Sequence, residues 1–153
     1  MSTASQADHR ATGTRLPWHA WVLEVLVLAV YLGGAWDYVN LILLNDDYFA
    51  AQGWGREAKA YFTDYPVPTR VLWTLNVAAA LAAPVLLFAR SHWTASVALV
   101  STLAQAVLMT VSFIFMGRLH ALGPAVAAFG VGILLLTATF WLYCRWIVRK
   151  WKG

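Results

Sequence analysis

The stretch WHAWVLEVLVLAVYLGGAWDYVNLILL, residues 18–44, decides the fold class, because it is apolar over more than the width of a bilayer. About 20 mainly apolar residues are enough for a helix to cross the hydrocarbon core. The run is too long for the apolar core of a signal peptide, and it has no convincing small-residue cleavage site. We therefore predict a first transmembrane helix over residues 18–38, with an extension to residue 44 left open.

Three more apolar segments follow at residues 67–89, 93–116 and 121–147. Backbone polar groups in lipid must be hydrogen-bonded within their own segment, so each segment is predicted to be a helix. The links at residues 90–92 and 117–120 are short, which makes neighbouring helices antiparallel. The prediction is an all-α integral membrane protein, an antiparallel bundle of four transmembrane helices with a long external link between helices one and two. Within that link, residues 56–62 are expected to form a short amphipathic helix.

The composition supports this fold class, since 61% of the 153 residues are hydrophobic and 12% are charged. Soluble domains have about 25% charged residues. The net charge is +4, but the basic residues flank apolar runs, which argues against nucleic acid as a partner. One cysteine excludes an internal disulfide. We expect no metal site and no cofactor, because the histidines lack i,i+4 spacing and no nucleotide-binding or HExxH motif is present.

Lysine and arginine set the predicted orientation. The side of the two termini has Arg10, Arg15, Arg90, Arg145, Arg149, Lys150 and Lys152, and the side of the long link has Arg56, Lys59, Arg70 and Arg118. We expect a multi-pass protein of the bacterial inner (plasma) membrane with both termini cytoplasmic. The predicted organisation is a disordered cytoplasmic tail at 1–16, a four-helix membrane domain at 17–147 and a basic cytoplasmic tail at 148–153.

Asp37 places a carboxylate where a membrane helix normally has an apolar residue. A charge within the bilayer costs at least about 2.5–3.5 kcal/mol, so the side chain is expected to face the bundle or water, together with Asn40 on the same helical face. Two interpretations stay open. Asp37 is either a solvated or ion-paired structural residue at the outer helix end, with Arg70 or Arg118 as its partner, or a ligand-binding or proton-handling group.

Glu24 is the second acid within a predicted membrane helix, one to two turns from its inner end. The main expectation is that its side chain snorkels to the interface or pairs near Arg90 or His92. A proton-handling role is the alternative.

Polar side chains inside the second and third helices are expected either to bond between helices or to line a pathway. Asn76 lies in the second helix, and Gln105 lies in the third with Ser101 one turn before it. Interhelical hydrogen bonds of this kind contribute about 0.6–2 kcal/mol each. Small residues let helices approach closely. We therefore predict that another helix packs closely against Gly33 and Gly34, and that the Ala128–Gly132 pair makes a second close helix contact.

The C-terminal stretch CRWIVRKWKG, residues 144–153, is cationic with interleaved tryptophans. This pattern predicts an anchor for anionic lipid head groups of the bilayer, formed by Arg145, Arg149, Lys150 and Lys152. A homo-oligomer is also expected, because transport sites usually lie between repeats or subunits, and one copy of four helices offers few helices to form such a site.

A set of residues between 30 and 103 is similar to a known family: Asp37, Tyr38, Asn45, Tyr48, Ala60, Tyr61, Phe62, Pro66, Trp73, Leu86, Leu87, Arg90, Trp93, Ser101 and Leu103. The chain resembles small bacterial four-helix membrane proteins that commonly carry the label hypothetical membrane protein or sugar transporter. The resemblance implies the four-helix topology and a sugar as solute. It departs at residues 79–84, where relatives are glycine-rich. A vaguer likeness is to DoxX-type proteins, which implies a redox-linked accessory subunit.

Two functional hypotheses follow. The first is a transporter-like protein for a small polar solute such as a sugar, held near the outer half by the aromatic and polar side chains of Trp36, Tyr38, Trp73 and Asn76. The second is a non-catalytic membrane accessory or assembly subunit, which predicts a closed bundle with all polar groups satisfied. Neither assigns a catalytic residue, and the chain is not expected to be an enzyme. An Asp37–Arg70 ion pair in a closed, dry bundle would remove the main support for the first hypothesis.

Overall fold

The computed structural model describes residues 18–152, with side chains described for residues 18–151. The regular elements in this range are all helices: α1 (Trp18–Ile42), α2 (Asp46–Ala51), α3 (Arg56–Thr63), α4 (Val67–Phe88), α5 (Thr94–Ile114) and α6 (Arg118–Lys152). Four of them, α1, α4, α5 and α6, are long and apolar enough to cross a membrane. The all-helical prediction with four long apolar segments is confirmed at this level. The tail expected at residues 1–16 lies outside the described residues.

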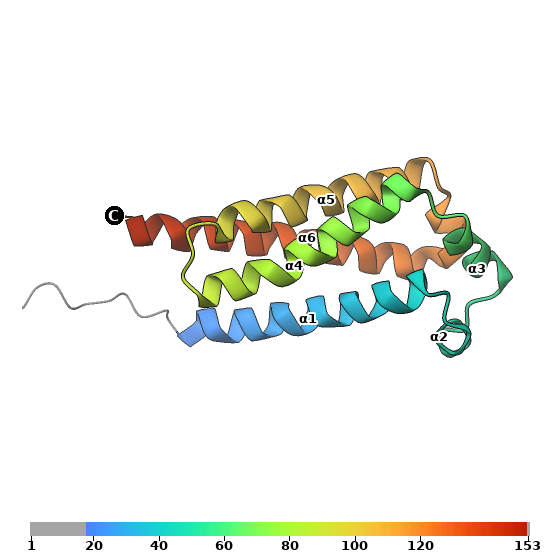
Figure 1. Cartoon of the computed structure of the whole chain (residues 1–153), viewed down its shortest axis with the longest axis horizontal. Coiled ribbons are helices and arrows are strands. Elements are labelled where there is room, and N and C mark those ends of the chain that lie inside the picture. Colours follow the sequence, from blue (N-terminus) through green and yellow to red (C-terminus); the bar gives the residue numbers. More distant parts are fainter. Residues whose placement is uncertain (1–17, 153) are drawn as a thin grey trace, which may run out of the picture.

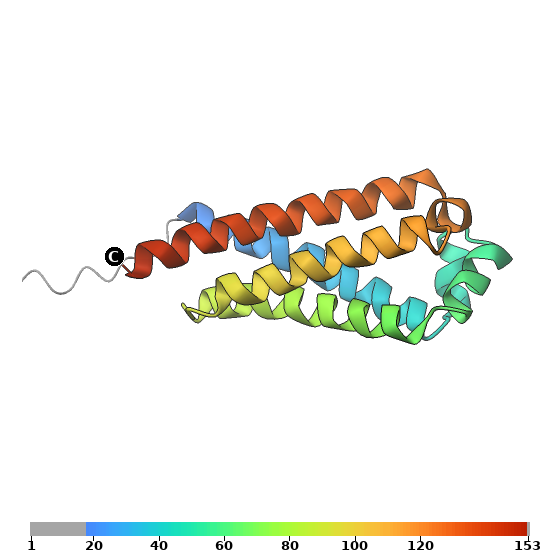
Figure 2. The same cartoon turned by 90° about the horizontal axis from the view of Figure 1, so that it is seen from above.

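The four long helices lie alongside one another (Figures 1 and 2). α5 packs against both α4 and α6, whereas α1 packs mainly against α4. The start of α1 and the end of α6 lie at one end of the molecule, here called the terminal end. α2 and α3 lie at the opposite end, here called the link end. Because α1 has a single main neighbour, its side toward α6 is where open space can remain.

At the terminal end, a cluster of buried side chains joins the four long helices. Val27 of α1, Leu87 of α4, Ala98 of α5 and Phe140 of α6 all belong to it. The ring of Tyr31 on α1 meets the ring of Phe140 edge-on, with 6.2 Å between their centroids. Edge-to-face pairs of this kind contribute about 0.5–1.5 kcal/mol, so this cluster holds α1 to α6 at the terminal end.

At the link end, a second cluster packs the long link onto the ends of the helices. Phe49 of α2 and Phe62 of α3 are both buried there, together with Leu122 of α6. The Phe62 ring lies 6.0 Å from the ring of Trp73 on α4. The link is therefore a folded cap rather than a loose loop.

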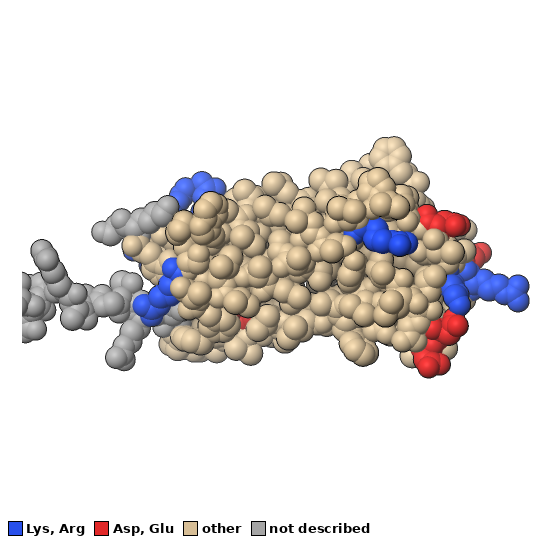
Figure 3. Space-filling view, viewed as in Figure 1, with Lys and Arg blue, Asp and Glu red and all other residues tan. Residues whose placement is uncertain are grey.

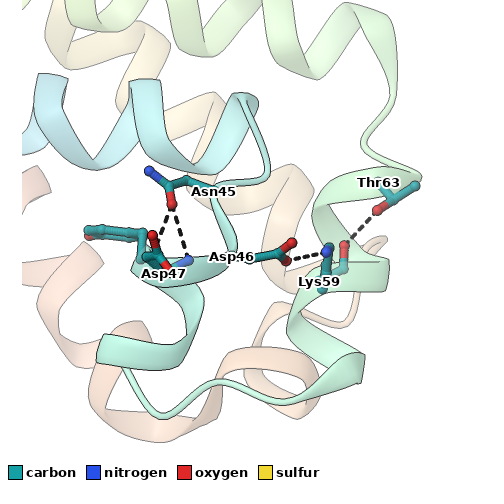
Figure 4. Close-up of polar contacts among 6 residues, drawn as sticks. Asn45, Asp46, Asp47, Lys59 and Thr63 are labelled. Carbon is teal, nitrogen blue, oxygen red and sulfur yellow. Dashed lines mark hydrogen bonds and ion pairs between the residues drawn. The ribbon is translucent and has the colours of Figure 1, made fainter.

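The link holds two short helices, and the sequence predicted one of them. α3 is the amphipathic helix expected at residues 56–62. α2 was not predicted; the Asn45 side chain caps it by accepting from the backbone N–H groups of Asp47 and Tyr48 at 3.1 and 3.3 Å (Figure 4). An ion pair between Asp46 of α2 and Lys59 of α3 ties the two helices together. An N-cap of this type contributes about 0.5–2 kcal/mol to a helix.

α6 is two helical pieces joined at Gly123, where φ is 82° and ψ is 170°. A residue with a β-carbon is strained at this positive φ, so glycine is needed at the break. Pro124 begins the longer piece, which suits a first helical turn because proline lacks an N–H that needs a partner there. The helix continues through residues 148–152, the segment expected as a basic tail.

The close contacts expected at small residues do not form within the described part of the chain. A β-carbon added at Gly33, Gly34 or Gly132 would meet no atom within 4 Å. The close approach occurs at Gly130 instead, where an added β-carbon would lie 2.8 Å from the Met109 side chain of α5. Which side of a helix meets its neighbour depends on packing that a short motif does not specify.

Candidate functional site

A partly enclosed cavity of about 410 Å³ lies between α1 and α6 and reaches the link. Its lining comes from all six helices, with Gln52 and Trp54 from between α2 and α3. Binding sites for small molecules typically occupy clefts of about 300–1,000 Å³ with mainly apolar walls and a few polar groups. Of the residues singled out in the sequence, Asp37, Trp73, Asn76, Gln105 and Arg118 all line this cavity.

Asp37 and Arg118 form the charged part of the lining at the link end. Asp37 accepts a hydrogen bond from the hydroxyl of Tyr48 on α2. In the described part of the chain Asp37 forms no ion pair with Arg70 or Arg118, so the expected pairing is wrong. The physical reason is the fold of the link, which brings a neutral phenol to the carboxylate and leaves both arginines free of it.

Tyr48 is held as a neutral donor. Its burial, and then its hydrogen bond to Asp37, raise the pKa of Tyr48 to about 12. A phenol that stays protonated keeps donating to the carboxylate across the whole physiological pH range. The Tyr48 hydroxyl therefore orients the Asp37 side chain at the cavity wall.

The deep wall of the cavity is a hydrogen-bonded network between α4 and α5. The Asn76 side chain donates from Nδ2 to Oε1 of Gln105 at 2.5 Å. Ser101 donates from Oγ to Oδ1 of Asn76 at 3.0 Å. All three side chains are buried, which confirms the expected interhelical bonds. Asn76 and Gln105 also face the cavity, so this network is available to a ligand as well.

Aromatic rings form much of the remaining wall near the link end. Trp54, Phe62 and Trp73 line the cavity there. Trp73 is fixed by Tyr65, whose ring lies 5.6 Å away, and by Tyr38 of α1, whose ring lies 5.0 Å away in an edge-on arrangement. These contacts hold a flat apolar surface beside the charged group Asp37.

Four of the candidate residues toward the link end lie outside the cavity lining, namely Trp36, Tyr38, Asn40 and Arg70. Asn40 is buried and donates to the backbone oxygen of Trp36 at 2.8 Å, while its own side-chain oxygen accepts from Asn45. It connects the end of α1 to the cap of α2 and serves the fold. Arg70 lies near the start of α4 and does not reach the cavity.

Glu24 occupies a very different place from the one expected. The side chain is 0% exposed, and neither carboxylate oxygen has a hydrogen-bond partner among the described residues. The expectation that it snorkels or pairs near Arg90 or His92 is therefore wrong. Glu24 shares the α1 face of Val27 and Tyr31, at i, i+3 and i+7, and this face is packed into the terminal-end cluster.

The basic residues of the C-terminal segment gather at the terminal end. Arg145, Arg149 and Lys150 are exposed, and the Lys150 ammonium lies 3.7 Å from the centre of the Trp146 ring. The side chain of Lys152 lies outside the described residues. Figure 3 shows most of the charged atoms at the two ends of the molecule, with a largely uncharged surface between them apart from one group of Lys or Arg atoms on the side nearer the link end. This distribution is what a protein that crosses a bilayer requires.

The sequence reasoning did not place any of the four cavity residues of the link in a site, namely Tyr48, Gln52, Trp54 and Phe62. Their signal was the aromatic and polar composition of the link, which the prediction assigned to an external connection. No protein-family model, no curated protein and no solved structure matches the chain.

Proposed function

We propose that the chain is a multi-pass protein of a bacterial inner membrane that binds a small polar solute, such as a sugar, in the α1–α6 cavity and assists its passage across the membrane. The proposal places it with the small four-helix proteins labelled sugar transporter. The cavity carries the proposal, because it combines rigid aromatic rings with amide and carboxylate groups in one partly enclosed space.

This combination fits the chemistry of a sugar. A sugar ring has apolar C–H faces that pack on aromatic rings, and Trp73 and Trp54 offer such surfaces. Its hydroxyl groups need donors and acceptors, which the amides of Asn76 and Gln105 and the carboxylate of Asp37 provide. A cavity of about 410 Å³ has room for a molecule of this size.

The same observations favour solute binding over an accessory subunit. An accessory subunit predicts a closed bundle in which every polar group is satisfied within the protein. Here a cavity remains between α1 and α6. Within the described residues, Asp37 forms no ion pair with Arg70 or Arg118.

The direct test is solute uptake into proteoliposomes, with D-glucose and maltose as probes and isothermal calorimetry as the binding readout. We expect uptake above that of protein-free liposomes, and strongly reduced uptake for Asp37→Asn and Trp73→Ala. Asp47→Asn is the matched control, because it removes an exposed carboxylate of the link end that does not line the cavity. Uptake equal to that of empty liposomes for both probes, with no calorimetric binding, would contradict the proposal.

The proposed orientation puts both termini in the cytoplasm and the link end outside. It follows from the larger number of lysines and arginines on the side of the termini. A C-terminal reporter that is active only in the cytoplasm tests it: we expect the membrane-inserted fusion to be active, and an inactive reporter on that fusion would overturn the orientation.

Two partners belong to the proposal. Anionic lipid head groups would bind the exposed basic residues at the terminal end. Binding to vesicles that contain phosphatidylglycerol should weaken when Arg149 and Lys150 are replaced by glutamine, whereas binding to vesicles without it should not change. A second copy of the chain would cover α1, which has α4 as its one main neighbour. Native mass spectrometry of the purified protein measures the number of chains in the complex directly.

A further inference from the structure

Glu24 is the only acidic or basic side chain that is buried in the described range. Both of its carboxylate oxygens lack a hydrogen-bond partner there. It shares its face of α1 with Val27 and Tyr31, which both belong to the terminal-end cluster. A group this costly to bury calls for a physical explanation.

Among the side chains described for residues 18–151, no cation forms an ion pair with the Glu24 carboxyl group. Within residues 18–151 the ion pair that forms is the one between Asp46 and Lys59, far from Glu24 in the chain. Described titratable side chains near Glu24 are Tyr143 and Cys144 of α6, and Tyr31 lies two turns further along α1. None of these carries a positive charge, and the Tyr143 hydroxyl also lacks a partner.

An isolated carboxylate in apolar surroundings is strongly disfavoured, whereas the neutral acid is tolerated. The cluster around Glu24 therefore accommodates a carboxylic acid. Deprotonation requires water to reach the group, which is 0% exposed in this arrangement of the helices.

Tyr31 connects this place to the cavity. Tyr31 lies seven residues after Glu24, two helical turns and about 10 Å along α1. Its ring packs on Phe140 in the same cluster, and it also lines the α1–α6 cavity. A solute that displaces Tyr31 from the cavity wall therefore changes the packing of α1 on α6 around Glu24.

We propose that Glu24 is the proton-binding site of a solute-linked cycle, in which the carboxyl group is protonated while α1 is closed on α6 and releases its proton to water at the terminal end when α1 moves away. The proposal rests on the proposed solute-binding function of the cavity. Because such coupling is reciprocal, occupancy of the cavity and proton binding at Glu24 change each other by the same factor.

The composition allows a direct readout, because the sequence contains two glutamates, Glu24 and Glu57. Protein labelled with ¹³C at the glutamate side-chain carboxyl gives two resonances, and Glu57→Gln assigns them. Glu57 is exposed and lies in the link, so it serves as an internal reference. In the solute-free protein at neutral pH, we expect the Glu57 signal at the carboxylate position and the Glu24 signal at the position of a protonated acid. A Glu24 signal at the carboxylate position would overturn the proposal, whatever the outcome for solute binding.

The linkage is tested by adding D-glucose or maltose to the same sample, with calorimetry reporting binding separately. We expect a bound probe to move the Glu24 signal and leave Glu57 unchanged, and the probe's affinity to change with pH on the order of ten-fold. In Glu24→Gln, which is neutral and nearly isosteric, that pH dependence should be lost while binding persists. A probe that binds but leaves the Glu24 signal unmoved would refute the linkage, whereas absence of binding by both probes would refute the proposed function.

Discussion

Replacing Asn76 and Gln105 by apolar residues tests whether the hydrogen-bonded network of the cavity wall also holds α4 to α5. Asn76→Leu and Gln105→Met keep the approximate size of each side chain and remove its polar atoms. Each single replacement leaves the other amide buried with its former partner missing, which is the costly situation for a polar group. The double replacement removes both members of the pair and leaves no orphaned amide.

The magnitude follows from the two side-chain bonds that Asn76 makes, one to Gln105 and one from Ser101. Interhelical hydrogen bonds in membrane proteins average about 0.6 kcal/mol and reach about 1.7 kcal/mol. Asn76→Leu should therefore reduce the free energy of unfolding by about 1–3 kcal/mol. The coupling energy between positions 76 and 105 should be about 0.6–1.7 kcal/mol, or about 3- to 18-fold in the unfolding equilibrium constant.

The assay is a double-mutant cycle measured by unfolding in mixed micelles with increasing dodecyl sulfate, followed by circular dichroism. Thr110→Val is the matched control on α5, because this exposed hydroxyl donates to its own helix at Ala106 rather than across helices. We expect little change for it. Strictly additive effects at positions 76 and 105, within about 0.3–0.5 kcal/mol, would refute the reasoning.

Three further predictions concern the link end. The pKa of folded Tyr48 is raised to about 12, so the phenol of the unfolded chain ionises first, and the stability that Tyr48 contributes is present below pH ~10 and is lost as the pH rises toward ~12. The absorbance difference between wild type and Tyr48→Phe should therefore titrate near pH 12. A midpoint near pH 10 would contradict the bond to Asp37. Asn45→Ala should destabilise α2 by about 0.5–2 kcal/mol and speed amide hydrogen exchange there, while Asn45→Ser restores the cap; unchanged exchange in the alanine variant would argue against the capping role. Lys59→Ala breaks an exposed ion pair with Asp46 and should cost no more than about 1 kcal/mol in thermal unfolding; a larger loss would mean that the pair organises the whole link.

The long helices were predictable because their signal is local. Each apolar run is long enough by itself to form a helix in lipid, independent of its neighbours. The expected segments at residues 67–89 and 93–116 differ from α4 and α5 by no more than two residues at either end. α2 was not predictable in this way, because its six residues depend on the Asn45 cap and on the packing of Phe49.

The candidate site was predictable only in part. Asp37, Trp73, Asn76, Gln105 and Arg118 stood out as polar or aromatic residues in apolar segments, and the fold brings all five to one cavity. The predicted partner of Asp37 was wrong. The sequence places a carboxylate and two arginines at the same end of the bundle, but it does not determine which donor the folded link brings to the carboxylate.

The sequence by itself determined that this chain has four long apolar helices, because hydrophobic length and backbone hydrogen bonding are properties of one segment at a time. Only the tertiary structure decided that Glu24 is sealed inside the terminal-end cluster and that Tyr48 reaches Asp37. Burial and partner choice depend on how α1 is rotated against α4 and α6, and on how the link folds back over the helix ends. Burial and hydrogen-bond partners are thus properties of the packed side chains. One apolar helix fits a membrane equally well in several rotations about its axis, so its sequence alone does not determine which residues face the neighbouring helices.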